Sequence, residues 1–148
     1  MTNKDNQAEY NAKRRIKAKE FLSKLPQVGS AKDRAILWGI NDVKNRERFA
    51  QGLSINEDGC IEWNASTYHN GYGVFNIIAD GTNLAAVKAH RFAYALKHGT
   101  LPNSIITNSD TIVIHHTCEN RICVNPEHLE AITSAENLSM QKKTKGVK

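Results

Sequence analysis

The feature that most constrains this chain is a dense run of metal-binding side chains at residues 115–129, HHTCENRICVNPEHL. The chain has three cysteines, and the one outside this run, Cys60, stands far upstream in DGCIEW. An odd cysteine count fits disulfide pairing poorly, whereas structural zinc takes four thiolate or imidazole ligands, often from short turns. We therefore predict a structural zinc site built from Cys60, Cys118, Cys123 and His128. The alternative is a set of buried thiols, which are common in cores. The polar neighbours Glu119, Asn120 and Arg121 favour zinc.

Two histidines of the run are left over by this assignment. His115 and His116 stand at the end of a predicted strand, where successive side chains point to opposite faces. One is suited to bind a second metal ion, and the other to accept a proton near neutral pH. Asn137, further along, offers a carbonyl oxygen of the kind that Mg²⁺ prefers. The spacing alone leaves open that all three are ordinary polar surface residues.

The first half of the chain reads as helical. Residues 1–7 are expected to be disordered, and apolar spacing predicts a helix over residues 8–25 that ends before Pro26. Ser30 is a candidate cap for a second helix through residue 50, and Gly39 weakens that helix enough to predict a possible break there.

After residue 52 the pattern changes to short strands. Asp80-Gly81 predicts a hairpin between residues 74–79 and 84–89, and a short helix is expected over 91–98. A polar loop over 103–110 should precede strands at 111–115 and 129–133. Thr133 and Glu136 form a capping box that opens a helix to about residue 143. The predicted fold class is α+β.

The charges are segregated along the sequence. Residues 1–50 carry twelve Lys or Arg against six Asp or Glu, and residues 51–140 carry four against nine. Residues 141–148 add four lysines. Basic ends suit phosphate binding, and the alternative is that they are solubilising tails. The candidate nucleic-acid-binding residues are Lys13, Arg14, Arg15, Lys17, Lys19, Lys142 and Lys143.

No apolar run approaches the ~20 residues that would cross a bilayer. The first ten residues, MTNKDNQAEY, lack the apolar stretch of a secretory signal. The prediction is a cytoplasmic protein with no membrane partner.

The segment IHHTCENRICVNPEHLEAITSAEN resembles the signature of the HNH nucleases, in particular phage-type HNH endonucleases and the related His-Cys box homing endonucleases. The upstream stretch over residues 48–102 is similar to the segment that precedes this signature in phage members. The resemblance covers roughly residues 46–140 and implies a ββα-metal fold, in which two strands and a helix surround one divalent cation. It also implies a preceding small antiparallel β region, with the helical N-terminal segment lying outside it.

The resemblance also implies roles for individual residues. His116 matches the family's general base, and Asn137 matches the metal ligand on the helix. Many members have Asp as a second metal ligand at the position of His115. A histidine at this position favours Mn²⁺ or another transition metal in addition to Mg²⁺. Arg91, in AHRF, is the candidate for holding the scissile phosphate. The Cys-x4-Cys-x4-His spacing with a distant upstream cysteine is similar to the structural zinc site of the His-Cys box members.

These implications define a metal-dependent DNA endonuclease of phage or homing type. Residues 1–50 would form a basic helical segment, and residues 51–148 the nuclease domain, with the ββα-metal motif at about 111–143. The expected partner is double-stranded DNA, bound by a monomer or a homodimer, in the host cytoplasm if the chain is phage-encoded. The competing hypothesis is a non-catalytic, zinc-stapled module that binds nucleic acid.

Overall fold

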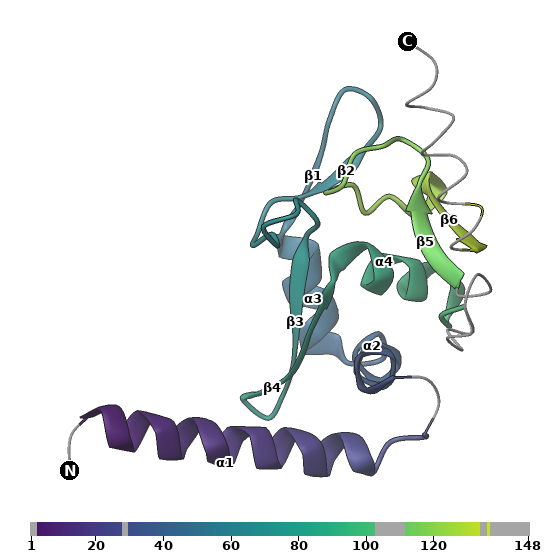
Figure 1. Ribbon diagram of the computed structural model, residues 1–148. Coiled ribbons are helices and arrows are strands. Elements are labelled where there is room, and N and C mark those ends of the chain that lie inside the picture. The colour runs from purple at the N-terminus through teal and green to yellow at the C-terminus, as the bar shows by residue number, and fades with distance from the viewer. Residues whose placement is uncertain (1–2, 28–29, 103–111, 134–135, 137–148) are drawn as a thin grey trace.

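The computed structural model describes residues 3–27, 30–102, 112–133 and 136. The chain begins with three helices and continues with three antiparallel hairpins, and one further helix separates the second hairpin from the third (Figure 1). The elements are α1 (Asn3–Ser23), α2 (Ala31–Gly39), α3 (Val43–Gln51), β1 (Leu53–Ile55), β2 (Ile61–Trp63), β3 (Val74–Ala79), β4 (Thr82–Lys88), α4 (Ala89–His98), β5 (Ile112–His116), the 3₁₀ turn η2 (Pro126–His128) and β6 (Leu129–Thr133). The α+β class is confirmed.

The N-terminal helices differ from the prediction in one respect. Helix α1 begins at Asn3, so residues 3–7, which were expected to be disordered, are helical. The predicted break in the second helix is confirmed, because α2 ends at Gly39 and α3 starts after Asp42. The Asp42 side chain accepts a hydrogen bond from the Asn45 backbone, which caps the new helix.

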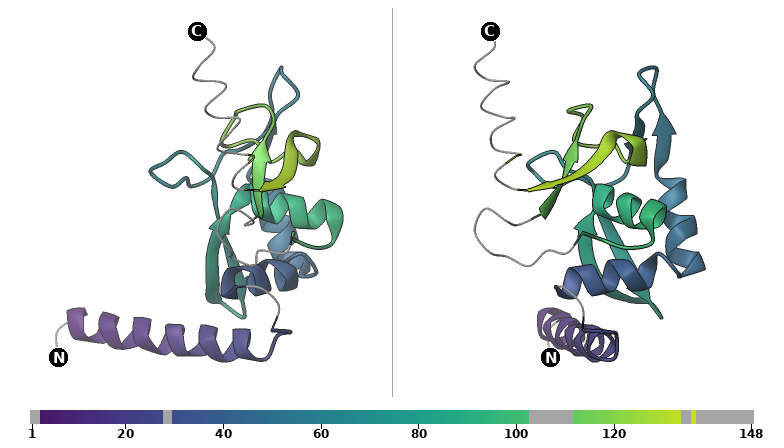
Figure 2. Two further views of the ribbon diagram at one scale, coloured as in Figure 1. Left: turned by 45° about the vertical axis from the view of Figure 1, so that its right-hand side comes forward. Right: turned by 90° about the vertical axis from the view of Figure 1, so that its right-hand side faces the viewer.

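The core is an aromatic cluster packed against the β3–β4 hairpin. The rings of Phe49, Trp63, Phe75 and Phe92 have centroid separations between neighbours of 4.7 to 5.6 Å. Helices α2, α3 and α4 lie around this hairpin. Helix α1 runs along the end of the molecule where the β3–β4 turn lies (Figures 1 and 2). The helices before residue 50 therefore share one core with the residues after it.

Asn45 fixes α3 to the hairpin at an irregular point. The β3–β4 register shifts between Ile77 and Ile78, which leaves backbone groups of Ile78 outside the regular ladder. The Asn45 side chain accepts a hydrogen bond from the Ile78 N–H at 3.0 Å and donates one to the Ile78 carbonyl at 2.9 Å. Its side chain is 1% exposed, so these bonds form in the interior.

The third hairpin carries the region that the sequence singles out. Strands β5 and β6 pair antiparallel, with His115 opposite Glu130 and His116 opposite Leu129. The predicted bounds of β6 are confirmed, and β5 ends one residue later than expected, at His116. Beyond β6, the Glu136 N–H donates to the Thr133 hydroxyl at 3.1 Å, one half of the predicted capping box. The rest of the expected helix, to residue 143, lies outside the described residues, as does the loop over 103–110.

Replacing Asn45 with alanine should destabilise the fold by about 2–4 kcal/mol, because two backbone groups of Ile78 would lose the buried side chain that bonds both of them. Asn41→Ala is the matched control, since the Asn41 side chain is exposed and bonds only within its own turn. Its cost should stay below about 0.5 kcal/mol. Urea unfolding of the two variants measures both values. Equal costs would show that Asn45 does not anchor α3.

Candidate metal centre and active site

Four side chains converge between the first and third hairpins. The ligand atoms of Cys60, Cys118, Cys123 and His128 all lie within 4.8 Å of one another. His128 Nδ1 lies 3.6 Å from Cys60 Sγ and 3.5 Å from Cys123 Sγ. Cys60 and Cys123 are buried, while Cys118 and His128 are half-buried. The structure thus brings together the four residues that the sequence predicts as one set.

The spacing of these atoms fits a single tetrahedral ion. With Zn–S near 2.3 Å and Zn–N near 2.0 Å, tetrahedral geometry separates a sulfur from a nitrogen ligand by about 3.5 Å. Two of the three sulfur-to-nitrogen distances in the cluster, those from His128 to Cys60 and Cys123 at 3.6 and 3.5 Å, have this value. Three cysteines and one histidine also form a ligand set that structural zinc takes. The cluster could therefore bind zinc.

The surroundings of the cluster change the pKa of Cys123. Burial, together with the neighbouring thiols of Cys60 and Cys118, raises the pKa of Cys123 to about 12, although a backbone hydrogen bond at Asn125 acts to lower it. A thiol with so high a pKa stays protonated near neutral pH unless a cation replaces its proton. Metal binding here must therefore release protons and becomes sensitive to pH.

Backbone contacts hold the two halves of the cluster together. Trp63 N–H donates to the Ile122 carbonyl at 2.8 Å, and Val124 N–H donates to the Ile61 carbonyl at 2.6 Å. These bonds flank a β-bridge between Glu62 and Cys123. The loop that carries Cys123 is thus an added edge on β2, only a few residues from Cys60.

His116 is oriented by this same loop. Its ring is 6% exposed, and its Nε2 lies 2.9 Å from the Cys123 carbonyl oxygen. A carbonyl only accepts, so Nε2 must carry the hydrogen and Nδ1 must hold the lone pair. Burial lowers the pKa of His116 to about 4, against the carbonyl bond, which raises it. The ring is therefore neutral near pH 7 and presents Nδ1 as a proton acceptor.

Two aromatic rings that the sequence prediction did not assign a role pack on His116. The His90 ring lies 4.4 Å from the His116 ring and the Tyr72 ring 5.8 Å, measured between centroids. His90 is 4% exposed, and its Nδ1 makes no hydrogen bond within the described part of the chain. Burial, with the nearby His116, Lys88 and Arg91, lowers the pKa of His90 to about 2, so this ring is also neutral.

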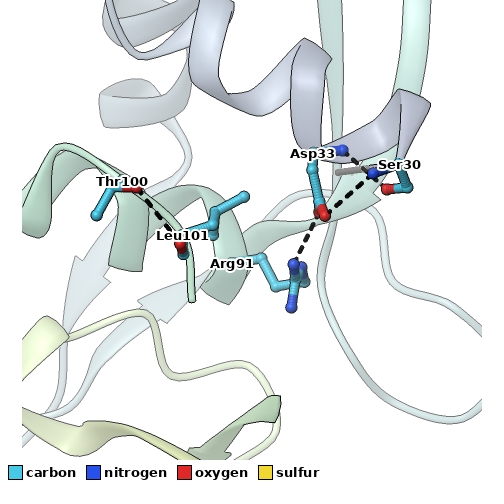
Figure 3. Close-up of polar contacts among 5 residues, drawn as sticks. All are labelled: Ser30, Asp33, Arg91, Thr100 and Leu101. Carbon is cyan, nitrogen blue, oxygen red and sulfur yellow. Dashed lines mark hydrogen bonds and ion pairs between the residues drawn. The ribbon is translucent and has the colours of Figure 1, made fainter. Parts of the chain in front are cut away.

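Arg91 is anchored to helix α2. Its Nη2 lies 2.8 Å from Asp33 Oδ1, in an ion pair that is mostly shielded from solvent (Figure 3). Asp33 also completes a capping box with Ser30, whose hydroxyl accepts from the Asp33 N–H. Arg91, the candidate for holding the scissile phosphate, is therefore positioned by a residue in the N-terminal cap of helix α2.

The remaining predicted residues fall into three groups. His115 is half-buried on β5, directly before His116 and opposite Glu130. On α1, Lys13, Arg15, Lys17 and Lys19 are exposed, while Arg14 is half-buried and reaches the Gly81 carbonyl. Asn137, Lys142 and Lys143 lie outside the described residues.

The structure thus defines an α+β protein in which a cysteine–histidine cluster that could bind a metal ion adjoins a buried, oriented histidine. Residues 87–139 match the HNH endonuclease family. This match confirms the resemblance for the segment from the end of β4 to beyond β6.

Two curated proteins of Escherichia phage T7 are similar to this chain. Protein 2.8 is 29% identical over 92 residues, which cover 62% of this chain and 55% of that protein. Protein 7.7 is 33% identical over 80 residues, which cover 54% of this chain and 52% of that protein. The chain thus spans about half the length of the curated relatives it matches. No solved structure matches the chain. None of the helices in the described residues is long and apolar enough to cross a membrane.

We expect the purified chain to hold one zinc ion, and Cys118→Ser to lose it. Loss of the ion should lower the free energy of unfolding by several kcal/mol, because metal binding free energy becomes folding free energy. His69→Ala is the control, since His69 is exposed and lies outside the cluster. Elemental analysis and thermal unfolding measure both effects. A folded Cys118→Ser variant with full zinc content would show that the cluster is misassigned.

Proposed function

We propose that the chain is a metal-dependent DNA endonuclease that hydrolyses phosphodiester bonds, with His116 as the general base. The observation that carries the proposal is the hydrogen bond from His116 Nε2 to the Cys123 carbonyl, which leaves Nδ1 as the acceptor. A buried histidine whose tautomer is fixed in this way is suited to general-base catalysis. The match of residues 87–139 to the HNH endonuclease family supports the same reaction class.

In the proposed reaction, His116 Nδ1 accepts a proton from a water molecule. The resulting hydroxide attacks phosphorus, the bond to the 3′-oxygen breaks, and that oxygen leaves with the departing strand. Because burial keeps His116 neutral at pH 7, the base is ready without prior loss of a proton. Arg91, steadied by Asp33, is proposed to hold a non-bridging phosphate oxygen.

The proposal includes two metal ions with separate tasks. Zinc in the cysteine–histidine cluster would be structural, and a divalent cation, Mg²⁺ or Mn²⁺, would stabilise charge on the phosphate and the leaving oxygen. The resemblance assigns that cation to Asn137 and His115. The imidazole of His115 suits Mn²⁺ better than Mg²⁺.

In this proposal, DNA affinity comes largely from residues outside the acidic segment 51–140. Residues 51–140 carry a formal balance of −5, which opposes a polyanion. Helix α1, which carries exposed cations, runs along one end of the molecule (Figure 1). Lys142 and Lys143 would add charge from the C-terminal part of the sequence. Residues 1–50 are proposed as the DNA-affinity segment and residues 51–148 as the cutting segment, in a cytoplasmic protein that acts as a monomer or a homodimer of phage or homing type.

A second function, a non-catalytic zinc module that binds nucleic acid, is favoured by one observation. The metal cluster accounts for the zinc ligands without using His115, His116 or Asn137. Binding alone, however, needs no buried histidine with a defined acceptor nitrogen, and His116 has one.

Purified protein should nick plasmid DNA when Mg²⁺ or Mn²⁺ is added, and His116→Ala should lower the rate by roughly 10²–10⁴-fold, the usual contribution of a general base. The rate should also fall as salt rises, because phosphate contacts release counterions. Agarose gels of supercoiled plasmid measure both effects.

His98→Ala provides the matched control, because His98 is exposed at the far end of α4. It should cut at the wild-type rate. Zinc content must be equal in all three proteins. DNA that stays uncut by wild type with either cation, while still being bound, would favour the non-catalytic module.

A further inference from the structure

The segment over residues 51–140 has four Lys or Arg residues: Lys88, Arg91, Lys97 and Arg121. Three of them gather around the His116 site. Lys88 is close enough to His90 and His116 to lower the pKa of both rings, and Arg91 lowers that of His90. Arg121 lies on the loop between Cys118 and Cys123. In a segment that is acidic as a whole, the cations are thus concentrated at one place.

The ring of Tyr72 contacts two of these cations. Lys88 Nζ lies 5.3 Å from the centroid of the Tyr72 ring, and Arg121 Cζ lies 5.5 Å from it. Both distances are within the range of cation–π attraction. The same ring packs 5.8 Å from the His116 ring, at an interplanar angle of 28°. Lys88 and Arg121 come from β4 and from the cysteine loop, so the ring joins cations that are distant in sequence.

Arg121 is held in place by a second contact. Its Nη1 donates to the Asn70 carbonyl at 2.6 Å, which ties the cysteine loop to the loop that carries Tyr72. The aliphatic part of the side chain lies near Gly71, where an added Cβ would meet Arg121 Cδ at 3.4 Å. The guanidinium is therefore positioned although the side chain is exposed.

No carboxylate in the described part of the chain forms an ion pair with Lys88 or Arg121. Burial lowers the pKa of Lys88, and the charges of Arg91 and Lys32 lower it further. Arg91 has Asp33 as its ion-pair partner, whereas Lys88 is left with like charges around it, and an anion bound beside Lys88 would offset their repulsion. Both side chains remain accessible to such an anion.

We propose that Lys88 and Arg121, arranged on the ring of Tyr72, bind backbone phosphates of the DNA strand beside His116. The inference rests on the proposed function for its substrate and names the contacts that hold that substrate. Tyr72 is a positioning residue, because it acts through the two cations. The cysteine–histidine cluster would then have a second role, since it fixes the loop that carries Arg121.

The test measures binding of a fluorescent DNA duplex to full-length protein without added Mg²⁺ or Mn²⁺, at several salt concentrations. Lys88→Gln and Arg121→Gln should each weaken binding roughly three- to tenfold at low salt. Each should also reduce the slope of log K against log salt by about 0.9, the value for one lost phosphate contact. Lys97→Gln removes the same charge at the other end of α4 and should change the slope far less.

Tyr72→Leu keeps every charge and should weaken binding, whereas Tyr72→Phe keeps the ring and should bind like wild type. Equal zinc content and thermal midpoints establish that all variants are folded. If Lys88→Gln and Arg121→Gln match Lys97→Gln in affinity and slope, the proposed site is overturned. If a folded Tyr72→Leu variant binds the DNA duplex as tightly as wild type does, the proposed role of the ring is overturned.

Failure of this site and failure of the proposed function give different results. If wild type cuts DNA but the slopes of Lys88→Gln and Arg121→Gln equal that of Lys97→Gln, the phosphate site is overturned and the endonuclease stands. If those slopes fall as expected but wild type cuts no DNA with either cation, the phosphate site is supported and the endonuclease is contradicted.

Discussion

Cys123 is the residue through which the metal cluster and the candidate base are coupled. Its thiol belongs to the cluster, its carbonyl accepts the hydrogen bond from His116 Nε2, and its backbone forms a bridge to β2. All three contacts come from one residue that is fully buried. An ion that holds the thiol therefore also holds the carbonyl that selects the His116 tautomer. In this account the structural metal prepares the base without touching the substrate.

This coupling explains why a domain with short strands can hold a precise site. The first and third hairpins have few paired residues, and the backbone bonds around Glu62 and Cys123 join them across the cluster. The aromatic rings pack against Trp63 at the end of β2, and Ile114, Val124 and Leu129 from the third hairpin and the cysteine loop belong to the same core. The site thus lies between this core and the cysteine–histidine cluster.

Much of this arrangement could be predicted from the sequence, because the signals were local or chemically distinctive. Cysteine and histidine spacing predicted the four cluster residues, and Asp80-Gly81 predicted the β3–β4 hairpin. The contacts of Tyr72 could not be predicted. It lies in an irregular loop without periodicity, and its neighbours come from β4, α4, β5 and the cysteine loop. Only tertiary packing reveals that such a ring adjoins the site. The helical state of residues 3–7 was also missed, because these polar residues lack the apolar spacing that predicted the rest of α1, whose first turns they form.

The most direct test of this account is the tautomer of His116 in the zinc-loaded protein, measured by ¹⁵N NMR of the imidazole rings, with His116→Gln used to assign the signals. The account predicts that Nε2 carries the proton and Nδ1 has the shift of an unprotonated ring nitrogen at neutral pH, because the Cys123 carbonyl accepts from Nε2. A proton on Nδ1 with an unprotonated Nε2 would contradict it, because the nitrogen proposed to take the proton from water would then already be occupied.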